Sequence, residues 1–334
     1  MPNATKRNPG FDCLRLICAF CVVCLHVAYP FKHLAEPWIR FAVPVFFMLS
    51  GYFYEGQRDH GKQIRKILFL CIGANLLHLG FQLLLNRISG HSSAGLLGSL
   101  GNLQVWMEFL LLNHSPVSSP LWYLGALLYV LVIMGLLDKG PGRKAMYPLI
   151  PVLLGLNLIL GTYSPVFFGR PLSIEISRNF LFAGLPFFLL GDLLRTETAA
   201  PGIPVFLTLA AGLVLSFLEN YLLYKLGLLV NQDLFLGTIP VSCALFRLTA
   251  ASSSRFENRL CRALAGWGHR CSLGIYILHP MVILGCRAFL SRFGAHFPAL
   301  NRAYILFAPV IVFSLSFLLC TIWNRITKKH PVQK

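Results

Sequence analysis

The chain has 334 residues, of which 56% are hydrophobic and only 12% are charged, and its formal net charge is +17. Together with a mean hydropathy of +0.67, this composition excludes an ordinary soluble domain and is typical of an integral membrane protein. A strongly basic chain can indicate nucleic-acid binding, but no nucleic-acid partner is expected here, because the basic residues lie mostly at the ends of apolar segments, where topology and anionic lipid explain them.

Ten apolar segments are near the length of about 20 residues that a helix needs to cross a bilayer. In chain order they are residues 11–30, 37–54, 65–86, 121–138, 146–163, 178–194, 203–219, 232–249, 272–291 and 303–324. A further stretch at residues 100–112 could be an interfacial or a re-entrant helix. The sequence therefore predicts an all-α polytopic membrane protein with about ten transmembrane helices, folded as a single membrane-embedded domain over residues 1–334.

The distribution of basic residues predicts the orientation. An even number of spans places both termini on one side; if that side is the cytoplasm, inner segments hold 19 of the 29 Lys and Arg residues and outer segments hold 9. The remaining one, Arg15, lies inside the first span. The positive-inside rule therefore predicts that both termini are cytoplasmic. Because no small-residue cleavage site follows the first span, we expect it to be retained rather than removed as a signal peptide.

The first apolar segment carries two costly residues, Arg15 and His26, eleven positions apart. Eleven positions make three helical turns plus about 20°, so both side chains share one face, about 16 Å apart along the axis. Ionisable groups inside a membrane usually face a protein interior or a water-filled path, so this stripe favours a passage that both residues line, with Ala19 at its border. The alternative is that Arg15 snorkels to the cytoplasm while His26 bonds a neighbouring helix.

A compact group of cations, Lys62, Arg65 and Lys66, lies at the cytoplasmic start of the third segment. The three positions fall within about one helical turn, which makes a patch suited to phosphate groups. The alternative is that these residues only anchor the helix end at the inner membrane surface.

Other spans contain polar positions that a plain lipid-facing helix would avoid. Ser50 precedes Gly51 near the inner end of the second span, where small residues allow close backbone approach. Trp122 opens the fourth span at the outer interface, where an aromatic belt also explains it. In the ninth span Tyr276 and His279 are three positions apart and share a face.

The cysteines indicate packing rather than a metal site or a disulfide framework. Nearly all of the 10 cysteines lie inside apolar spans, where cysteine acts as a small hydrophobe. Cys18, Cys21 and Cys24 have a spacing like that of iron–sulfur ligands, but a continuous helix spreads them over more than one face and no fourth ligand is near. We therefore expect no metal centre.

The motifs, taken in order, resemble those of the acyltransferase type 3 family of membrane proteins over about residues 10–325. They are Arg15-x10-His26; Pro44 with Phe46-Phe47-x-x-Ser50-Gly51-Tyr52; Lys62-x-x-Arg65; Leu121-Trp122-Tyr123-Leu124; and Ser272-Leu-Gly-Ile-Tyr276-Ile-Leu-His279-Pro280. The family usually has Arg where this chain has Lys62, so the charge is retained there while a bidentate phosphate contact is lost.

The resemblance implies an integral membrane O-acyltransferase. Members of the family move acyl groups, commonly acetyl, from cytoplasmic acyl-coenzyme A to hydroxyls of extracytoplasmic sugars, peptidoglycan or lipid-linked glycans. For this chain we then expect acyl-coenzyme A as a co-substrate, with no permanently bound cofactor, and a cell-envelope glycan or lipid-linked sugar as acceptor. The expected location is the cell membrane of a bacterium, crossed several times.

The resemblance and the residue chemistry together suggest roles. His26 and Arg15 are the expected catalytic residues. His26 is the expected general base, because imidazole titrates near neutral pH, and Arg15 is expected on the route of the donor. Lys62, Arg65 and Lys66 are expected to hold the phosphates of acyl-coenzyme A. Candidate substrate-binding residues in the wall of the site are Ser50, Trp122, Tyr276, His279, Glu36 and Glu219, of which the two glutamates could orient His26 from the outer side. Interhelical hydrogen bonding explains Tyr276 and His279 equally well.

Two other classes of function remain open. A transporter also lines its path with polar residues, although the sequence shows neither an inverted repeat nor paired broken helices. A sensory or binding module could keep the fold without the chemistry. The presence of both Arg15 and His26 favours an active enzyme.

Overall fold

The computed structural model describes residues 8–54, 59–138, 142–195, 202–229, 233–251 and 258–328, and the regular elements in these ranges are all helices. The α-helices are α1 Pro9–His26, α2 Lys32–Ile39, α3 Ala42–Tyr52, α4 His60–Ser89, α5 Ala94–Leu100, α6 Leu103–Leu112, α7 Trp122–Leu137, α8 Leu149–Leu160, α9 Ser164–Phe168, α10 Ile174–Ser177, α11 Leu185–Leu194, α12 Ile203–Lys225, α13 Thr238–Ala251, α14 Arg259–Phe293 and α15 Pro298–Lys328. Short turns η1 Ser119–Leu121, η2 Arg143–Met146 and η3 Phe180–Gly184 join them. The prediction of an all-α protein is confirmed. Several basic residues that predict the orientation lie in residues 1–7 and 329–334, outside the described residues.

Six helices in the described ranges are long and apolar enough to cross a membrane. They are α1, α4, η1 with α7, α12, α14 and α15. The stretch at residues 100–112 belongs to the pair α5 and α6, which is bent by 63° and forms a seventh span if the pair crosses the membrane as one broken helix. On α4, Phe69 is 70% and Leu76 is 63% exposed, as expected of side chains that face lipid. The chain is therefore a multi-pass membrane protein.

The other four predicted spans are shorter than the sequence suggested. Within residues 37–54, 146–163 and 232–249 the helices α3, α8 and α13 have 11, 12 and 14 residues. Within residues 178–194, η3 and α11 together run from Phe180 to Leu194. Within the described residues, the prediction of ten full-length spans is therefore not confirmed.

Buried polar side chains satisfy irregular backbone beside three of these segments, those at residues 146–163, 178–194 and 232–249. Asn157 Nδ2 donates to the carbonyl oxygens of Ser177 and Phe182, at 2.9 and 3.1 Å. Thr162 Oγ1 donates to the carbonyl oxygen of Leu234 at 2.5 Å. Irregular backbone at membrane depth is tolerated where the surrounding protein satisfies its polar groups, and both of these polar side chains are buried.

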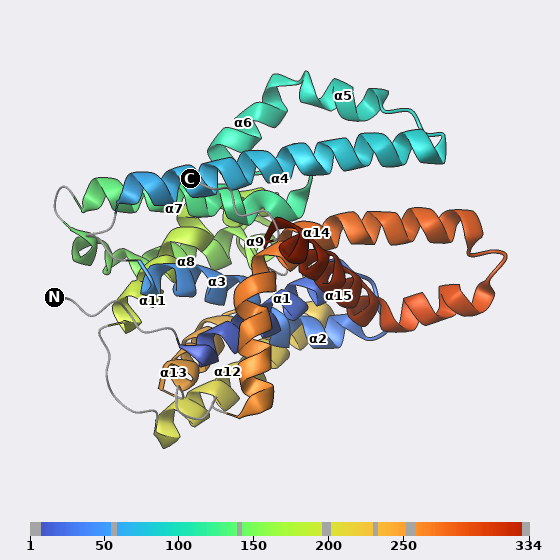
Figure 1. Ribbon diagram of the computed structural model, residues 1–334. Helices are drawn as coiled ribbons and strands as arrows, with labels where there is room; N and C mark the ends of the chain where they lie inside the picture. Colours follow the sequence, from blue (N-terminus) through green and yellow to red (C-terminus); the bar gives the residue numbers. More distant parts are fainter. Residues whose placement is uncertain are drawn as a thin grey trace.

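Helix α1 runs through the middle of the molecule, between α3 and α14 (Figure 1). A Cβ atom on Gly268 of α14 would overlap the carbonyl oxygen of Asp12, so the two backbones touch near the start of α1. At the other end of α1, the ring centroids of His26 and His279 lie 5.2 Å apart. Helices α1 and α14 are therefore parallel neighbours over the whole length of α1.

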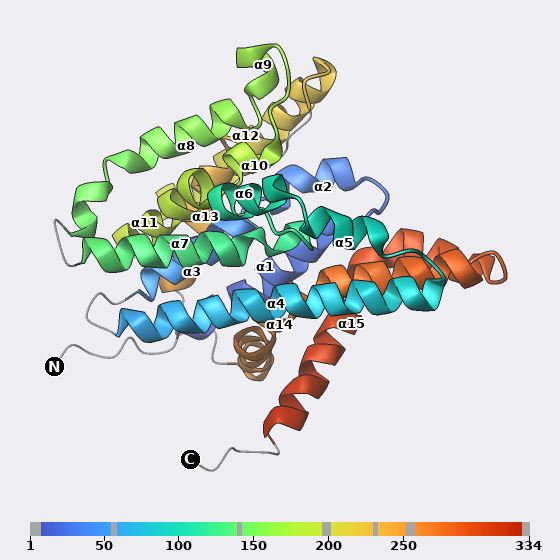
Figure 2. The same ribbon diagram turned by 90° about the horizontal axis from the view of Figure 1, so that it is seen from above.

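The remaining helices enclose this centre. A Cβ atom on Gly51 of α3 would overlap the carbonyl oxygen of Phe188, which places α3 directly against α11. Helix α4 runs beside α14 (Figure 2), where His78 Nε2 lies 2.8 Å from the carbonyl oxygen of Ile277. The result is a central group of α1, α3, α7, α11 and α14, and the candidate site lies among its side chains.

Candidate active site

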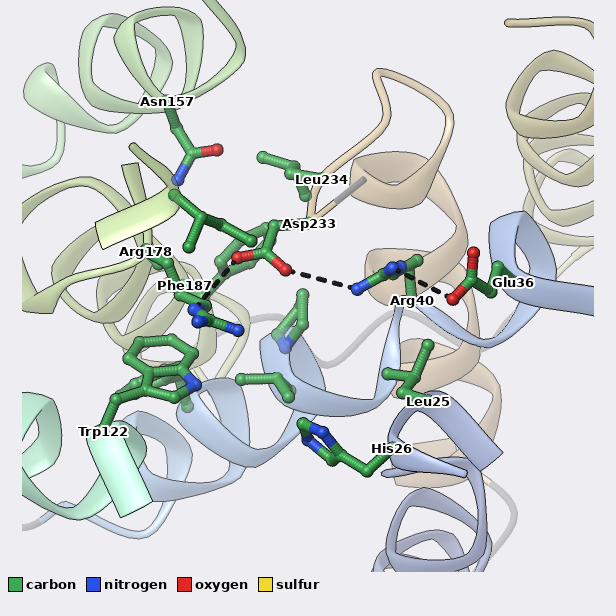
Figure 3. A pocket seen from close by; sticks show the side chains of 15 residues that line it. Leu25, His26, Glu36, Arg40, Trp122, Asn157, Arg178, Phe187, Asp233 and Leu234 are labelled. Atoms are coloured by element: carbon green, nitrogen blue, oxygen red, sulfur yellow. Dashed lines mark hydrogen bonds and ion pairs between the residues drawn. The ribbon is translucent and has the colours of Figure 1, made fainter. Parts of the chain in front are cut away.

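A cavity of about 320 Å³ opens beside the C-terminal end of α1 (Figure 3). We call it the outer cavity, after the predicted orientation of the chain. His26, Glu36 and Trp122 are lining residues that the sequence singled out. The structure thus brings together side chains from α1, α2 and α7 that lie far apart in the sequence.

Charged side chains from three segments meet over the outer cavity. Arg40 Nη1 lies 3.2 Å from Asp233 Oδ1, and Arg178 Nε lies 3.3 Å from Asp233 Oδ2 (Figure 3). Glu36 Oε1 lies 3.4 Å from Arg40 Nη2 and 3.5 Å from Lys32 Nζ. Three cations therefore share two carboxylates, and the network gives the cavity a polar rim with one positive charge in excess.

His26 is the last residue of α1, and its imidazole faces the outer cavity (Figure 3). Within the described part of the chain its ring nitrogens make no hydrogen bond, and the side chain of His279 packs against the ring. The sequence suggested that Glu36 could orient this ring, but the carboxylate of Glu36 is paired with Arg40 and Lys32 instead. A neutral imidazole with an unengaged nitrogen can accept a proton from a substrate hydroxyl.

A second cavity, of about 280 Å³, lies nearer the start of α1 and is called here the inner cavity. Arg15, Ser50 and Tyr276 line it, as do Gln63 and Tyr123. Ser50 Oγ donates to the carbonyl oxygen of Phe46 at 2.9 Å and lies 3.4 Å from the hydroxyl oxygen of Tyr123. The inner cavity therefore combines one cation with several hydroxyl groups.

Arg15 is held in place by two contacts. Its Nη1 lies 2.8 Å from Asp12 Oδ1, and its guanidinium carbon lies 5.2 Å from the centroid of the Phe53 ring. Asp12 is 2% exposed, so the charge of Arg15 is balanced by a buried partner on its own helix. Arg15 thus contributes to the wall of the inner cavity rather than merely reaching for the membrane surface.

Aromatic side chains separate the two cavities. Phe46 and Tyr123 line the inner cavity, whereas their chain neighbours Phe47 and Trp122 line the outer one. The rings of Phe47 and Tyr123 are 4.6 Å apart between centroids, and those of Tyr123 and Tyr276 are 5.5 Å apart. Arg15 and His26 therefore lie at two cavities with an aromatic partition between them, where the sequence predicted one continuous passage.

Ala19 does not lie on such a passage. It is 1% exposed and packs in a cluster with Cys271 and Ile275 of α14, and it lines neither cavity. The expectation that Ala19 borders the passage is wrong, because α14 covers that part of α1. Helical spacing fixes which residues share a face, but not which neighbouring helix covers it.

The cation patch lies at the edge of the inner cavity. Gln63 and Ile67 line that cavity, and Lys62 and Lys66 are their chain neighbours on α4. The side chain of Lys62 is 78% exposed, and its Nζ lies 3.3 Å from Asp59 Oδ2. Hydrogen bonds from Lys62 lower the pKa of the Asp59 carboxyl. Arg65 Nε donates to the carbonyl oxygen of Gly61 at 3.2 Å, and the rest of its guanidinium stays exposed.

Two candidate substrate-binding residues, Glu219 and His279, lie away from both cavities. Glu219 Oε1 accepts from the hydroxyl of Tyr163 at 2.5 Å and from the backbone N–H of Leu236 at 3.0 Å, so its carboxylate holds the segment before α13 and does not reach His26. His279 is fully buried and lines neither cavity. Both residues correct the expectation of direct substrate contact.

The loop that carries Arg178 is fastened by a histidine–glutamate contact. His114 Nδ1 lies 3.1 Å from Glu175 Oε1. Ile174 and Arg178, on either side of Glu175, line the outer cavity. Hydrogen bonding from His114 lowers the pKa of Glu175 to about 2, below its ordinary value of about 4.3.

This contact predicts an acid-dependent contribution to stability. A carboxyl whose pKa is depressed in the folded state stabilises the fold above its ordinary pKa, and the contribution is lost as the pH falls from about 4.3 toward 2. Glu175→Gln is expected to make the melting temperature of the detergent-purified protein fall less steeply between about pH 5 and pH 3. Glu108→Gln, on α6 where the carboxylate accepts from Gln104, controls for the loss of one negative charge. Parallel curves for wild type and Glu175→Gln would contradict the assignment.

Sequence reasoning missed the charged rim of the outer cavity. Arg40 and Arg178 border apolar segments and entered the prediction only as signals of orientation, and Asp233 stands at the start of residues 232–249. The available signal was the rarity of acidic residues, of which the chain has only 12. A charged residue beside an apolar segment needs a partner of opposite charge, so Asp233 could be expected to pair with a cation. The sequence could not tell which partner.

Comparison with known proteins gives one match. The model of a family described as an acyltransferase domain matches residues 8–322, nearly the whole chain. No curated protein and no solved structure matches.

Proposed function

We propose, because the chain belongs to the acyltransferase-domain family, that it moves an acyl group, in the simplest case acetyl, from acyl-coenzyme A to a hydroxyl of an extracytoplasmic acceptor. The proposed acceptor is a cell-envelope glycan or a lipid-linked sugar, and the proposed location is a bacterial cell membrane. The observation that carries the proposal is the arrangement along α1, where Arg15 lines one cavity and His26 lines the next. A donor can enter from one side and an acceptor from the other.

His26 is the proposed general base. As the acceptor oxygen attacks the thioester carbonyl, His26 takes the hydroxyl proton, the oxygen–carbon bond forms and the carbon–sulfur bond breaks. The imidazolium then returns the proton to the departing thiolate of coenzyme A. No covalent acyl-enzyme is required, because donor and acceptor meet at the same imidazole.

The outer cavity suits a hydroxyl-rich acceptor. Its rim of Arg40, Asp233 and Arg178 offers both donors and acceptors of hydrogen bonds. Trp122 and His26 lie along the same side of the cavity, with Asn157 across from them (Figure 3). The guanidinium carbon of Arg178 lies 5.8 Å from the centroid of the Trp122 ring, so Trp122 and Arg178 form one wall against which an acceptor can rest.

The donor is proposed to bind through the cation patch and the inner cavity. The phosphates of coenzyme A lie at Lys62, Arg65 and Lys66, and the pantetheine arm enters beside Gln63 toward Arg15. The thioester then reaches the aromatic partition, which must open for the acyl carbon to meet His26. The partition keeps the cavities separate until both substrates are bound, which limits wasteful hydrolysis of the thioester.

The donor site predicts a binding defect. Replacing Lys62 and Arg65 together by glutamine is expected to weaken coenzyme A binding by about 10-fold or more, since each charge-assisted hydrogen bond is worth about 1.5–3 kcal/mol and salt screens part of it. Calorimetry at low ionic strength measures the affinity. Arg259→Gln and Arg262→Gln, at exposed positions of α14, remove the same charge elsewhere. Equal affinity for coenzyme A in all variants would contradict phosphate binding by the cation patch and would leave it only the role of anchoring the helix end.

The overall proposal is tested on the acceptor. Envelope glycans from cells with and without the protein are compared by mass spectrometry, and the expected result is an acyl mass that disappears with the gene and returns with the wild-type chain. An unchanged glycan profile, including lipid-linked sugars, would contradict the proposed acceptor class.

A further inference from the structure

His279 occupies a special position in α14. Pro280 lies inside this helix and has no N–H to donate to the carbonyl oxygen of Tyr276. The side chain of His279 is fully buried and turns toward its own helix, with Nδ1 3.2 Å from the carbonyl oxygen of Ile275. The local break in the hydrogen-bond ladder thus lies beside an imidazole.

This contact determines the tautomer of His279. A carbonyl oxygen can only accept, so Nδ1 must carry the proton in the contact with Ile275. Nε2 of the neutral ring is then left with a lone pair. Nε2 is buried and has no hydrogen-bond partner among the described residues. A buried acceptor without a partner is costly. The direction of the Nε2 lone pair therefore indicates where a hydrogen-bond donor is needed.

The ring of His279 lies behind His26. The two centroids are 5.2 Å apart and the ring planes are inclined by 33°. His26 lines the outer cavity and His279 does not, so His279 contacts the side of His26 that faces away from the cavity. Neither predicted carboxylate takes this place, because Glu36 is bound to Arg40 and Glu219 to Tyr163.

We propose that His279 is a positioning residue that accepts a hydrogen bond from the ring N–H of His26. The inference rests on the proposed function of His26 as general base. The terminal torsion of the His26 ring is soft, and with the two centroids 5.2 Å apart the rings are close enough for a ring N–H of His26 to be directed at Nε2 of His279. A neutral imidazole has one N–H and one lone pair, so engaging the N–H behind the ring directs the lone pair into the outer cavity, toward the acceptor hydroxyl.

In this membrane-embedded site His279 orients the catalytic imidazole, a task for which a carboxylate is used in other enzymes. A buried carboxylate beside His26 would add a charge that the membrane interior disfavours. A neutral acceptor whose own tautomer is fixed by the helix backbone orients the base without that charge.

The first arm of the test uses activity. His279→Leu removes the acceptor and is expected to lower kcat by about 10- to 100-fold, with the KM for acyl-coenzyme A unchanged. His279→Gln places an amide oxygen near the position of Nε2 and is expected to recover most of kcat. Leucine and glutamine variants of equal activity would overturn the proposal.

The second arm reads the tautomer directly and does not depend on acyl transfer. Full-length protein labelled with ¹⁵N-histidine in lipid nanodiscs is studied by NMR, and the signals of His26 and His279 are assigned with His26→Ala and His279→Gln. In wild type we expect His279 to be protonated at Nδ1 and His26 to hold one tautomer, and we expect His279→Leu to release His26 into a mixture. His78→Leu, which removes another buried imidazole contact to α14, should leave His26 unchanged.

The two arms separate the possible failures. A wild-type His26 that already samples both tautomers, or a His279 protonated at Nε2, overturns the proposal even if the leucine variant does not fold. A correct tautomer pattern in a protein without transferase activity would leave the pairing in place and refute the proposed function.

Discussion

Replacing His26 by alanine is expected to reduce acyl transfer by about 100-fold or more, the usual scale of a general base, while the protein still folds and inserts. The fold should tolerate the change because the imidazole faces a cavity at the end of α1 and makes no hydrogen bond within the described residues. Among the described residues that line the outer cavity, His26 is the one with an imidazole, and alanine removes it. Transfer is measured as release of coenzyme A in membranes that contain equal amounts of each variant.

His33→Ala is the matched control. His33 lies on α2, is exposed, and stacks on Tyr224 at 6.4 Å between ring centroids. It lines neither cavity, so its loss is expected to leave the rate near that of wild type. A His26→Ala protein with normal expression and normal transfer would remove His26 from the mechanism and leave the outer cavity without a base.

The sequence predicted well what depends on local structure. Arg15 and His26 share a side of one helix because α1 is unbroken from Pro9 to His26, and helical geometry over so short a distance is set by the chain itself. The same holds for Ser50, which lies near the inner end of α3, and for the cations at the start of α4. Arg15 and Ser50 line the inner cavity, the cations border it, and His26 lines the outer cavity.

Ion pairs and hydrogen bonds between distant segments could not be predicted from the sequence. Arg40 and Asp233 are separated by 193 positions, and no spacing rule connects them. Glu36 and Glu219 were equally plausible partners of His26, yet one pairs with Arg40 and the other receives the N–H of Leu236. Which carboxylate meets which cation depends on how the helices pack.

The predicted number of full-length spans is not confirmed in the described residues, for a related reason. Apolar windows show how many consecutive residues can face lipid. They do not show where a buried side chain hydrogen-bonds a backbone carbonyl group in place of the next turn of helix. Asn157 of α8 donates to the carbonyl oxygens of Ser177 and Phe182, and so satisfies irregular backbone in residues 178–194, a segment that the apolar window predicts to be a full span. Helices that face lipid, such as α4 and α15, follow the windows closely.

Closing the mouth of the inner cavity is expected to stop the reaction from the donor side. Gln63 lines this cavity but is itself exposed, so Gln63→Trp places an indole across the entrance without overpacking a core. We expect transfer to fall by about 100-fold, because a donor held even about 1 Å from its productive position can cost that much. Ser50→Trp, deeper in the same cavity, should have the same effect.

The controls separate obstruction from general damage. Phe69→Trp adds an indole on the same helix at a position that is 70% exposed and away from the cavity, and Gln63→Ala and Ser50→Ala remove polar groups without filling space. All three should keep most of the activity. If Gln63→Trp is as stable and as active as Phe69→Trp, the donor does not use the inner cavity. The thioester would then have to reach His26 by a path that avoids Arg15, and the order of Arg15 and His26 along α1 would lose its mechanistic meaning.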